Sequence, residues 1–225
     1  MKVVVTGGGT REYIDDVRVM TNISSGKLAA LIAEQVYVTA PSDDRIEVVY
    51  IHGRHAALPG TPAKHVPITT TQDALEAMEE HCEFADVVIH PMAVSDFTFQ
   101  RDKPVKVSGS DASAFVEYMR QTIVPTPKLL AKVRTWSPKC FLVGFKFLSG
   151  ASFADLTEAA RKVLNDNLCD LVVANDLQAM KKAKTHVAHF LTRDNEVSVS
   201  TYEGKDRIAH GVAAHVDSWW RFGRD

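Results

Sequence analysis

A run of three glycines directly after a short apolar strand most constrains how this chain can fold. Val3, Val4 and Val5 form the predicted strand, and Gly7, Gly8 and Gly9 follow after one threonine. Glycine accepts backbone conformations that are closed to other residues, and it lets a ligand approach the main chain closely. The pattern therefore predicts a tight turn at the end of a strand, with room for a bound group.

A second segment of this kind, Ser24-Ser25-Gly26-Lys27, stands directly before an apolar helical pattern that runs from Lys27 to about Gln35. Backbone N–H groups point outward at a helix N-terminus, and the helix dipole favours an anion there. Taken separately, the glycines would make a turn and the serines would cap the helix. Two such segments on one connection favour a phosphate-bearing ligand.

Two familiar nucleotide-binding motifs fit this connection poorly. A dinucleotide fingerprint needs a small residue where Glu12 stands, and it needs a helix at once, whereas residues 13–22 lack a clean helical period. A P-loop needs glycine spacing upstream of Gly26 and Lys27 that this sequence does not have. An NAD(P)-binding reductase or regulatory module is therefore an alternative hypothesis that these residues do not favour.

Alternating strand and helix patterns along the rest of the chain predict a three-layer, doubly wound α/β fold. The sheet is expected to be Rossmann-like and mostly parallel, with helices on both faces. Strands are predicted at 46–51, 64–68, 87–89, 115–121, 140–146 and 171–176, followed by a C-terminal hairpin of 186–192 and 197–202. Helices are predicted at 72–83 with Thr71 as the cap, at 129–133 with Thr126 as the cap and Pro127 in the first helical position, at 152–167, and from Lys205 onward.

Length and composition fit one domain of an ordinary soluble protein. Apolar residues make up 45% and charged residues 24% of the 225 residues, and the net charge of −2 gives no general attraction to nucleic acid or anionic membrane. Cys82, Cys140 and Cys169 are odd in number and widely spaced, which is typical of reduced thiols in a cytoplasm. Neither a signal peptide nor a membrane-spanning segment is expected.

The loops that follow two later strands also carry polar residues. Ligands of open parallel sheets bind outside the carboxyl ends of the strands, so residues 90–97 should share a crevice with the glycine loop. Asp96, in this second loop, could contact a ribose, a base or a metal, or it could make an Asx-turn. His52 and His55 are expected to be solvent-exposed loop histidines, because no third metal ligand stands at a recognisable spacing.

The opening stretch reads Gly-Gly-Thr-Arg-Glu, then Ile-Asp-x-Val-Arg, then Thr-Asn-x-Ser-Ser-Gly-Lys. It closely resembles the N-terminal signature of the phosphopantothenoylcysteine synthetases, the phosphopantothenate–cysteine ligases of coenzyme A biosynthesis. Further along, Met-Ala-Val-Ser-Asp-Phe and Ala-Asn-Asp resemble segments of the same family, and Lys-Val-Ser and Val-Gly-Phe-Lys resemble its stand-alone, single-domain bacterial forms. The likeness covers nearly the whole chain and implies a single ligase domain over residues 1–225. Residues 36–45, which include a predicted turn at 41–44, look like a local insertion in this family.

The resemblance implies that 4′-phosphopantothenate and L-cysteine are joined through an acyl-nucleotide, with CTP, or ATP, as co-substrate. It also implies Mg²⁺, a homodimer and a cytoplasmic location. The flavin-dependent decarboxylase that precedes this domain in many bacterial relatives is not expected on this chain, and neither is its flavin. No nucleic acid or membrane partner is expected.

The same resemblance implies roles for individual residues. Asn22 and Lys106 would be catalytic, with Lys103 as the competing choice of lysine. The nucleotide would be bound by Gly7, Gly8, Gly9, Ser24, Ser25, Gly26, Lys27, Ala93, Asp96, Phe97, Phe145 and Lys146, with Asp96 also as a metal ligand. The substrates would be bound by Arg18, Asn22, Asn175 and Asp176. For Phe145 the alternative is a place in the core, and for Asn175 and Asp176 it is a structural cap.

Overall fold

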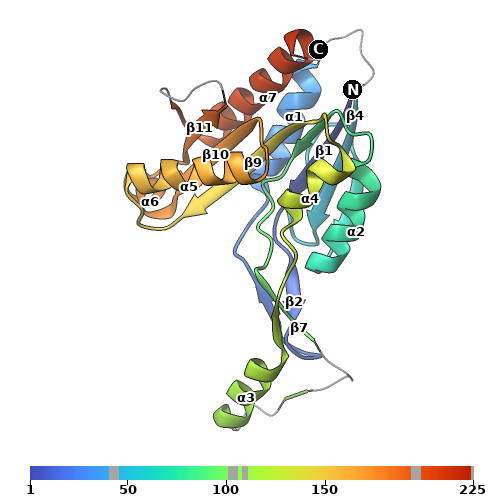
Figure 1. The fold of residues 1–225 in the computed structure, drawn as a ribbon, viewed down its shortest axis with the longest axis vertical. Coiled ribbons are helices and arrows are strands. Elements are labelled where there is room, and N and C mark those ends of the chain that lie inside the picture. Colours follow the sequence, from blue (N-terminus) through green and yellow to red (C-terminus); the bar gives the residue numbers. More distant parts are fainter. Residues whose placement is uncertain (41–45, 101–105, 108–110, 194–198, 224–225) are drawn as a thin grey trace.

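The computed structural model describes residues 1–40, 46–100, 106–107, 111–193 and 199–223, which form a body and a projecting arm (Figure 1). An eight-stranded sheet crosses the body in the order β12-β11-β10-β9-β6-β1-β4-β5. Its parallel strands are β1 (Lys2–Gly7), β4 (Glu47–Gly53), β5 (Lys64–Ile68), β6 (Val87–Ile89), β9 (Phe141–Leu148) and β10 (Leu171–Asp176). The antiparallel hairpin β11 (Val187–Thr192) and β12 (Ser200–Glu203) forms one edge. The expected mostly parallel sheet with a C-terminal hairpin is thereby confirmed.

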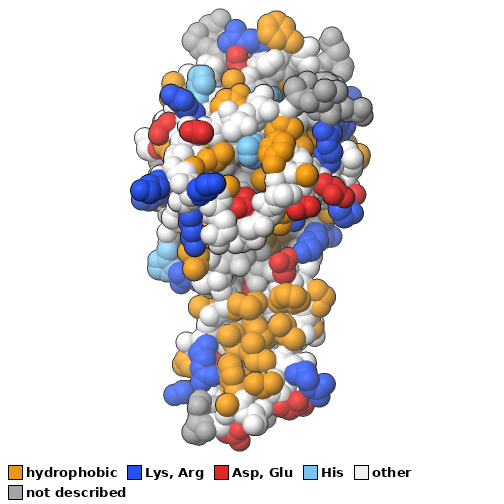
Figure 2. Space-filling model, turned by 90° about the vertical axis from the view of Figure 1, so that its left-hand side faces the viewer, with side chains coloured by type: hydrophobic (Ala, Val, Ile, Leu, Met, Phe, Trp, Pro, Cys, Tyr) orange, Lys and Arg blue, Asp and Glu red, His pale blue; other side chains and the backbone are white. Residues whose placement is uncertain are grey.

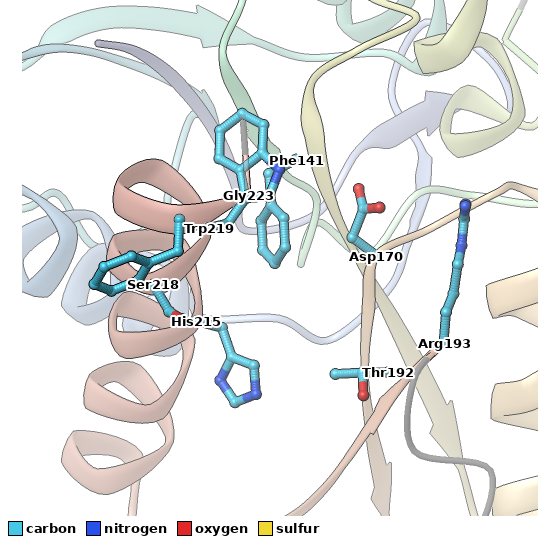
Figure 3. A pocket seen from close by; sticks show the side chains of 9 residues that line it. Phe141, Asp170, Thr192, Arg193, His215, Ser218, Trp219 and Gly223 are labelled. Carbon is cyan, nitrogen blue, oxygen red and sulfur yellow. The ribbon is translucent and has the colours of Figure 1, made fainter. Parts of the chain in front are cut away.

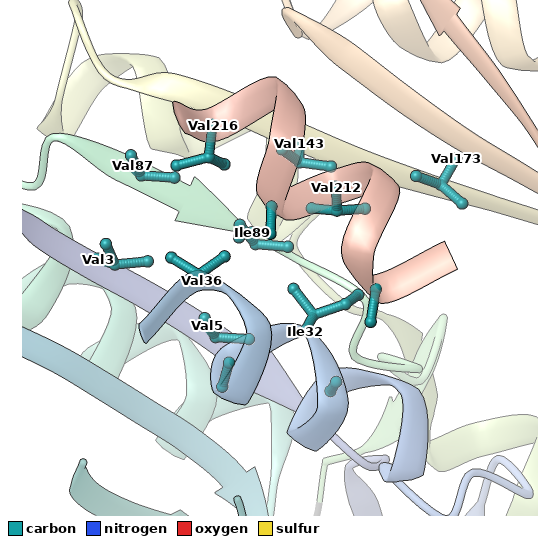
Figure 4. Close-up of a cluster of buried hydrophobic side chains, with 14 of the residues drawn as sticks. Val3, Val5, Ile32, Val36, Val87, Ile89, Val143, Val173, Val212 and Val216 are labelled. Carbon is teal, nitrogen blue, oxygen red and sulfur yellow. The ribbon is translucent and has the colours of Figure 1, made fainter. Parts of the chain in front are cut away.

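Helices cover both faces of the sheet, as the doubly wound interpretation requires. Alternate residues of each strand point to opposite faces, so Val3 and Val5 join one core while Val4 joins the other. The first core lies under α1 (Lys27–Thr39) and α7 (Lys205–Phe222), whose valines and isoleucines interleave with those of the strands (Figure 4). The second core lies under α2 (Thr71–Cys82), α4 (Leu129–Trp136) and α5 (Phe153–Asp166).

Several helix boundaries differ from the predictions. Helix α1 continues to Thr39, because Val36 is buried against the first core, so residues 36–39 belong to this helix. Residues 41–45, where a turn was predicted, lie outside the described residues. Helix α2 begins one residue early: Thr70 is its cap, and its side chain accepts the N–H of Asp73 in a capping box. The capping box of Ser152 and Asp155 on α5 is confirmed.

The expected start of α4 is wrong. Its N-cap is Lys128, without a side-chain hydrogen bond, so Pro127 stands before the helix and not in its first position. The hydroxyl of Thr126 donates to the backbone oxygen of Ser95 instead, and this bond holds the chain against the loop after β6. Thr126 therefore makes a loop contact and does not cap α4.

The strand predicted at 115–121 is also wrong, because these residues lie in α3 (Ala112–Thr122). Asp111 caps this helix by accepting the N–H of Ala114. Its apolar side chains do follow a helical period, so the strand interpretation overlooked an amphipathic pattern, although none of the residues of α3 is fully buried. The short helix α6 (Leu177–Ala183) was not predicted; Asp176 caps it.

The arm consists of two short hairpins and α3 (Figure 1). One hairpin pairs β2 (Arg11–Tyr13) with β3 (Val19–Thr21), and the other pairs β7 (Phe97–Phe99) with β8 (Ile123–Pro125). Figure 2 shows hydrophobic side chains gathered over one side of the arm. The exposed large hydrophobic residues of this part of the chain are Tyr13, Val17, Val19, Phe97, Val116 and Ile123.

The three cysteines are all buried and unpaired. Cys82, Cys140 and Cys169 belong to the second core, among the side chains of α2, α4 and α5. Burial raises the pKa of Cys82 and Cys169 to about 12 and that of Cys140 to about 11. They are packing residues, and their thiols stay protonated.

Candidate functional site

The glycine loop and the loop of residues 90–97, which were expected to share a crevice, are joined by backbone hydrogen bonds. The backbone N–H of Ala93 donates to the oxygen of Gly8 at 2.9 Å, and that of Thr10 donates to the oxygen of Ala93 at 3.2 Å. Gly9 and Ala93 thereby form an isolated parallel bridge beyond the ends of β1 and β6. The glycine loop and the 90–97 loop therefore lie side by side at the carboxyl edge of the sheet, as the parallel topology predicts.

The glycine loop also lies against the start of α1. Gly8 and Gly26 both have left-handed backbones, with φ of 77° and 69°. A Cβ built on Gly8 would lie 2.6 Å from the Cβ of Ala56, and one built on Gly26 would lie 2.8 Å from it. Ala56 follows β4, so the two predicted anion-binding segments and a third loop meet at a point where only glycine fits.

The serines before α1 do not cap it through their side chains. The N-cap is Gly26, and no side-chain hydrogen bond reaches it. The nearest interaction, from the N–H of Lys27 to Oγ of Ser25, is 3.5 Å long. Ser24 is half-buried and Ser25 exposed, so both hydroxyls lie at a helix N-terminus that favours an anion. The structural interpretation of these serines as caps is not supported.

A cavity of about 320 Å³ opens where these segments meet. Its wall includes Gly9, Asn22, Ser24 and Ser25, which the sequence predicted. It also includes Arg11, Thr21, Ile23, Gly53, His55 and Ala56, which were not predicted as site residues. A signal for the last three was present, because residues 53–56 follow a predicted parallel strand just as residues 7–9 do.

The two histidines after that strand differ from the expectation and from each other. His52 is a buried residue of β4, stacked on Tyr50 with ring centroids 5.5 Å apart, so its prediction as an exposed loop residue is wrong. Burial lowers the pKa of His52 below its ordinary value. His55 is exposed, as predicted, and faces the cavity.

Asn22 connects the cavity to the 90–97 loop. Its side-chain amide donates to the backbone oxygen of Val94 at 3.0 Å, and the side chain is exposed. This contact holds an amide, which can both donate and accept hydrogen bonds, beside the two segments that were predicted to bind an anion.

Asp96 and Phe97 stand where the 90–97 loop enters the arm. The carboxylate of Asp96 is largely exposed and forms an ion pair with Lys128. Phe97 begins β7 and is 48% exposed. Among the described residues, no group of three or more His, Cys, Asp or Glu side chains could hold a metal ion.

Arg18 and Lys106 lie in the arm. The guanidinium of Arg18 donates to the oxygen of Val107 at 2.8 Å, lies 3.6 Å from the carboxylate of Asp15, and covers the ring of Phe115. Lys106 precedes Val107 and is exposed. The structure therefore brings Arg18 close to the Lys106 segment, while Lys103 lies outside the described residues.

The Asp15 carboxylate organises this part of the arm. It accepts backbone N–H groups from Val17, Arg18 and Val107. Burial alone would raise its pKa, but these hydrogen bonds and the charge of Arg18 outweigh that effect, so the pKa of Asp15 lies below its ordinary value.

The predicted site residues of β9 and β10 are not in the cavity wall. Phe145 packs against the first core, and Lys146 is its half-buried neighbour. The amide of Asn175 donates to the oxygen of Val187 at 2.6 Å. Asp176 caps α6 and also accepts the N–H of Ala151. The structural role stated as the alternative for Asp176 is observed, Asn175 makes a different structural contact, and the predicted substrate contacts of both residues stay predictions.

The sequence matches the family "DNA/pantothenate metabolism flavoprotein C-terminal domain" over residues 1–219. The chain belongs to this family. It is 36% identical over 188 residues to the "Coenzyme A biosynthesis bifunctional protein CoaBC" of Thermococcus kodakarensis, a match that covers 83% of this chain and 44% of that protein. The chain thus spans less than half the length of this relative.

Solved structures of family members have the same fold. The DNA/pantothenate metabolism flavoprotein from Streptococcus pneumoniae superposes with a TM-score of 0.82 at 31% identity, covering 97% of this chain and 99% of that one. The C-terminal domain of a CoaBC protein superposes with a TM-score of 0.73 at 25% identity, covering 98% and 95% of the two chains. None of the helices in the described ranges is long and apolar enough to cross a membrane.

A second cavity, of about 540 Å³, lies between α7 and the ends of three strands of the sheet (Figure 3). It is lined by Phe141 and Asp170, at or before the first residues of β9 and β10, and by side chains of α7 such as His215 and Trp219. It contains none of the residues that carry the family resemblance.

Proposed function

We propose that this chain is a phosphopantothenate–cysteine ligase domain. The observation that carries the proposal is the convergence of the signature segments: the glycine loop, Asn22 and the serines before α1 line one cavity, joined to the Ala93 loop by backbone hydrogen bonds. Family membership and the coenzyme A role of the relative from Thermococcus kodakarensis support it. The NAD(P)-binding alternative has no comparable support, because β2 follows the glycine loop where that motif requires a helix.

The proposed reaction has two steps. The carboxylate of 4′-phosphopantothenate attacks the α-phosphorus of a nucleoside triphosphate, forming an acyl-nucleotide and releasing pyrophosphate. The amine of L-cysteine, having lost its extra proton, then attacks the acyl carbon and releases the nucleoside monophosphate. No protein nucleophile is needed in this scheme, which agrees with three buried, protonated cysteines.

The chain's own residues supply positive charge and hydrogen-bond donors. Two anions must meet in the first step, so donors aimed at the phosphates lower its barrier. We assign this role to the N–H groups of Gly8 and Gly9, the N-terminus of α1, Lys27 and Lys106. Asn22 would donate to the acyl oxygen in the second step.

We further propose Mg²⁺ bound with the nucleotide. Mg²⁺ usually takes one or two protein carboxylates and completes its shell with phosphate oxygens and water. Asp96 fits such a single ligand, since it is exposed and has only Lys128 as an ion-pair partner among the described residues. The ion would neutralise phosphate charge when bound.

For the nucleotide we propose CTP over ATP. A site built to hydrogen-bond one base edge rejects a base without it, because its own buried groups stay unpaired. Backbone groups of residues 92–96 would read the cytosine edge, and the proposal rests mainly on the Val-Gly-Phe-Lys likeness at 143–146. Phe145 is half-buried and packs against the first core, so only its remaining exposed surface would contact the base.

We also propose a homodimer that forms through the arm and works in the cytoplasm. Arg18 lies four residues before Asn22, which is about 13 Å along an extended strand, so it stands well beyond the cavity of its own chain. The exposed hydrophobic side of the arm (Figure 2) is a surface that a second copy would cover. Arg18 would then approach the partner's cavity, where a guanidinium suits a carboxylate or phosphate.

The test is pyrophosphate release from nucleotide and 4′-phosphopantothenate, followed by cysteine-dependent formation of 4′-phosphopantothenoylcysteine. Initial rates against CTP and ATP concentration, with both other substrates saturating, give the two values of kcat/KM. A higher value for ATP would overturn the CTP assignment alone. Absence of pyrophosphate release with either nucleotide would overturn the ligase proposal.

A further inference from the structure

Glu12, the residue that argues against a dinucleotide motif, is a buried carboxylate at the base of the arm. It lies in the middle of β2 and is only 2% exposed. One carboxylate oxygen accepts the backbone N–H of Thr71 at 2.7 Å and the hydroxyl of Thr71 at 2.6 Å. The other accepts the hydroxyl of Thr98 at 2.7 Å.

These three hydrogen bonds join segments that are far apart in the sequence. Thr71 is the first residue of α2, which belongs to the body, whereas Glu12 and Thr98 lie in β2 and β7 of the arm. The carboxylate also stands at the N-terminus of α2, where the helix dipole favours a negative charge. One side chain therefore fastens both hairpins of the arm to a helix of the body.

Neighbouring polar contacts extend this junction. The hydroxyl of Thr10 accepts the N–H of Ser95 at 2.9 Å and lies 3.2 Å from the hydroxyl of Thr71. The N–H of Arg11 donates to the oxygen of Thr69 at 2.7 Å. Farther out, α3 has no fully buried residue, so no apolar core of its own holds that helix in place.

We infer that Glu12 is a positioning residue that fixes the direction of the arm relative to the anion-binding loops. The inference rests on the proposed function, because the arm matters for catalysis only if Arg18 and Lys106 act there. The glycine loop and the segment before α1 belong to the body, and neither is joined to Glu12 by these hydrogen bonds. Phe97, at the start of β7, is a residue assigned to the nucleotide that lies in the arm. Loss of Glu12 should therefore affect catalysis and arm mobility more than nucleotide binding.

Three variants test this: Glu12→Ala, Glu12→Gln and Thr98→Val, with Glu79→Ala, an exposed glutamate on α2, as the matched control. Glu12→Ala should lower kcat by about ten- to a hundredfold, because small misplacements of reacting groups have effects of this size. The dissociation constant of Glu12→Ala for nucleotide should stay within about twofold of that of the original protein. We would treat only a larger increase as a loss of binding. In Glu12→Gln the amide oxygen can accept hydrogen bonds from Thr71 and the NH₂ group can donate one to Thr98, so this variant should keep most of the original rate.

Hydrogen exchange measured by mass spectrometry gives a readout that does not depend on activity. Amides of β2, β3 and α3 should exchange faster in Glu12→Ala, while those of β1, β4 and β6 stay protected. Thr98→Val, which removes one hydrogen bond and keeps the two from Thr71, should do the same to a smaller extent. If Glu12→Ala fails to fold, this milder variant decides the question.

Two results would overturn the inference. One is unchanged exchange in the arm together with a kcat close to that of the original protein. The other is an equal rise of exchange in body and arm, which would make Glu12 an ordinary stabilising residue. If the original protein proves not to be a ligase, the exchange pattern still tests the positioning role of Glu12. Failure of the proposed function can therefore be told apart from failure of this inference.

Discussion

The hydroxyl of Tyr50 occupies the space that a side chain at Gly7 would need. A Cβ built on Gly7 would lie 2.2 Å from the hydroxyl oxygen and 2.7 Å from the ring carbon that bears it. Tyr50 is fully buried, and its hydroxyl donates to the oxygen of Ala57 at 3.0 Å and lies 3.5 Å from that of Gly26. Burial and the nearby charge of Glu34 raise the pKa of Tyr50, so it remains a donor. One phenol thus braces the glycine loop, the loop after β4 and the start of α1.

We expect Tyr50→Phe to keep the ring packing but weaken nucleotide binding several-fold, with a loss of about 1 kcal/mol in stability from the missing hydrogen bond. Gly7→Ala should weaken binding at least about tenfold, because its methyl group displaces the loop. Nucleotide titration calorimetry and thermal unfolding measure the two effects. Tyr202→Phe, on the remote hairpin, is the control and should change neither. Unaltered binding in Gly7→Ala would show that the loop does not hold the nucleotide.

Asn22→Ala should keep its thermal midpoint, because the side chain is exposed and makes one hydrogen bond, to Val94. Conversion of the acyl-nucleotide by cysteine should slow by about a hundredfold or more, as for removal of an oxyanion donor. Rapid quenching with labelled nucleotide would show the intermediate accumulating. A much lower midpoint with normal activity per folded molecule would instead assign Asn22 a structural role.

Lys106→Gln should suppress nucleotide–pyrophosphate exchange by about tenfold or more while changing nucleotide affinity little, because its charge acts on the activation step. Lys132→Gln, an exposed lysine on α4, is the control. The same loss in Lys103→Gln, with Lys106→Gln nearly normal, would move the role to Lys103.

Stability should fall in acid through His90. This residue is buried, its Nδ1 lies 2.8 Å from the hydroxyl of Thr6, and burial lowers its pKa from 6.5 to about 4. Between pH 6.5 and pH 4, His90 is therefore protonated in the unfolded chain but neutral in the folded chain. Its contribution to stability is present above pH 6.5 and is lost as the pH falls towards 4. At pH 5 the loss should reach about 2 kcal/mol.

Urea unfolding of the original protein and of His90→Asn at pH 7.5 and pH 5 measures this contribution. Other histidines with lowered pKa values, such as His52 and His81, act in the same direction in both proteins, so the difference isolates His90. Equal losses in the two proteins would contradict the assignment.

Light scattering should show a dimer, and Val17→Asp should dissociate it, because this arm residue is 61% exposed in the single chain and a charge would be buried at the interface. Val38 on α1 is similarly exposed, at 68%, and Val38→Asp should leave the protein a dimer. A fully active monomer at assay concentration would rule out the shared site.

The body of the fold could be predicted from the sequence, whereas the arm could not. Val3–Val5 and Val87–Ile89 are central strands whose apolar runs follow from burial on both faces. In contrast, β2 and β3 have only three residues each, too few to show a period, and the helical period of α3 was overlooked because none of its residues is fully buried. Of the site, the glycine and serine segments were identified by their chemistry. Arg11 was missed because only the folded sheet brings it to the cavity, and His55 was missed although its loop follows a predicted parallel strand.

The three core cysteines have a consequence for the protein's redox behaviour. L-cysteine, the proposed substrate, oxidises to cystine, and any accessible thiolate could attack that disulfide and be trapped as a mixed disulfide. Buried thiols with pKa values of about 11 to 12 have almost no thiolate to react. A protein built in this way can work in a pool of cysteine and cystine without becoming covalently modified by it.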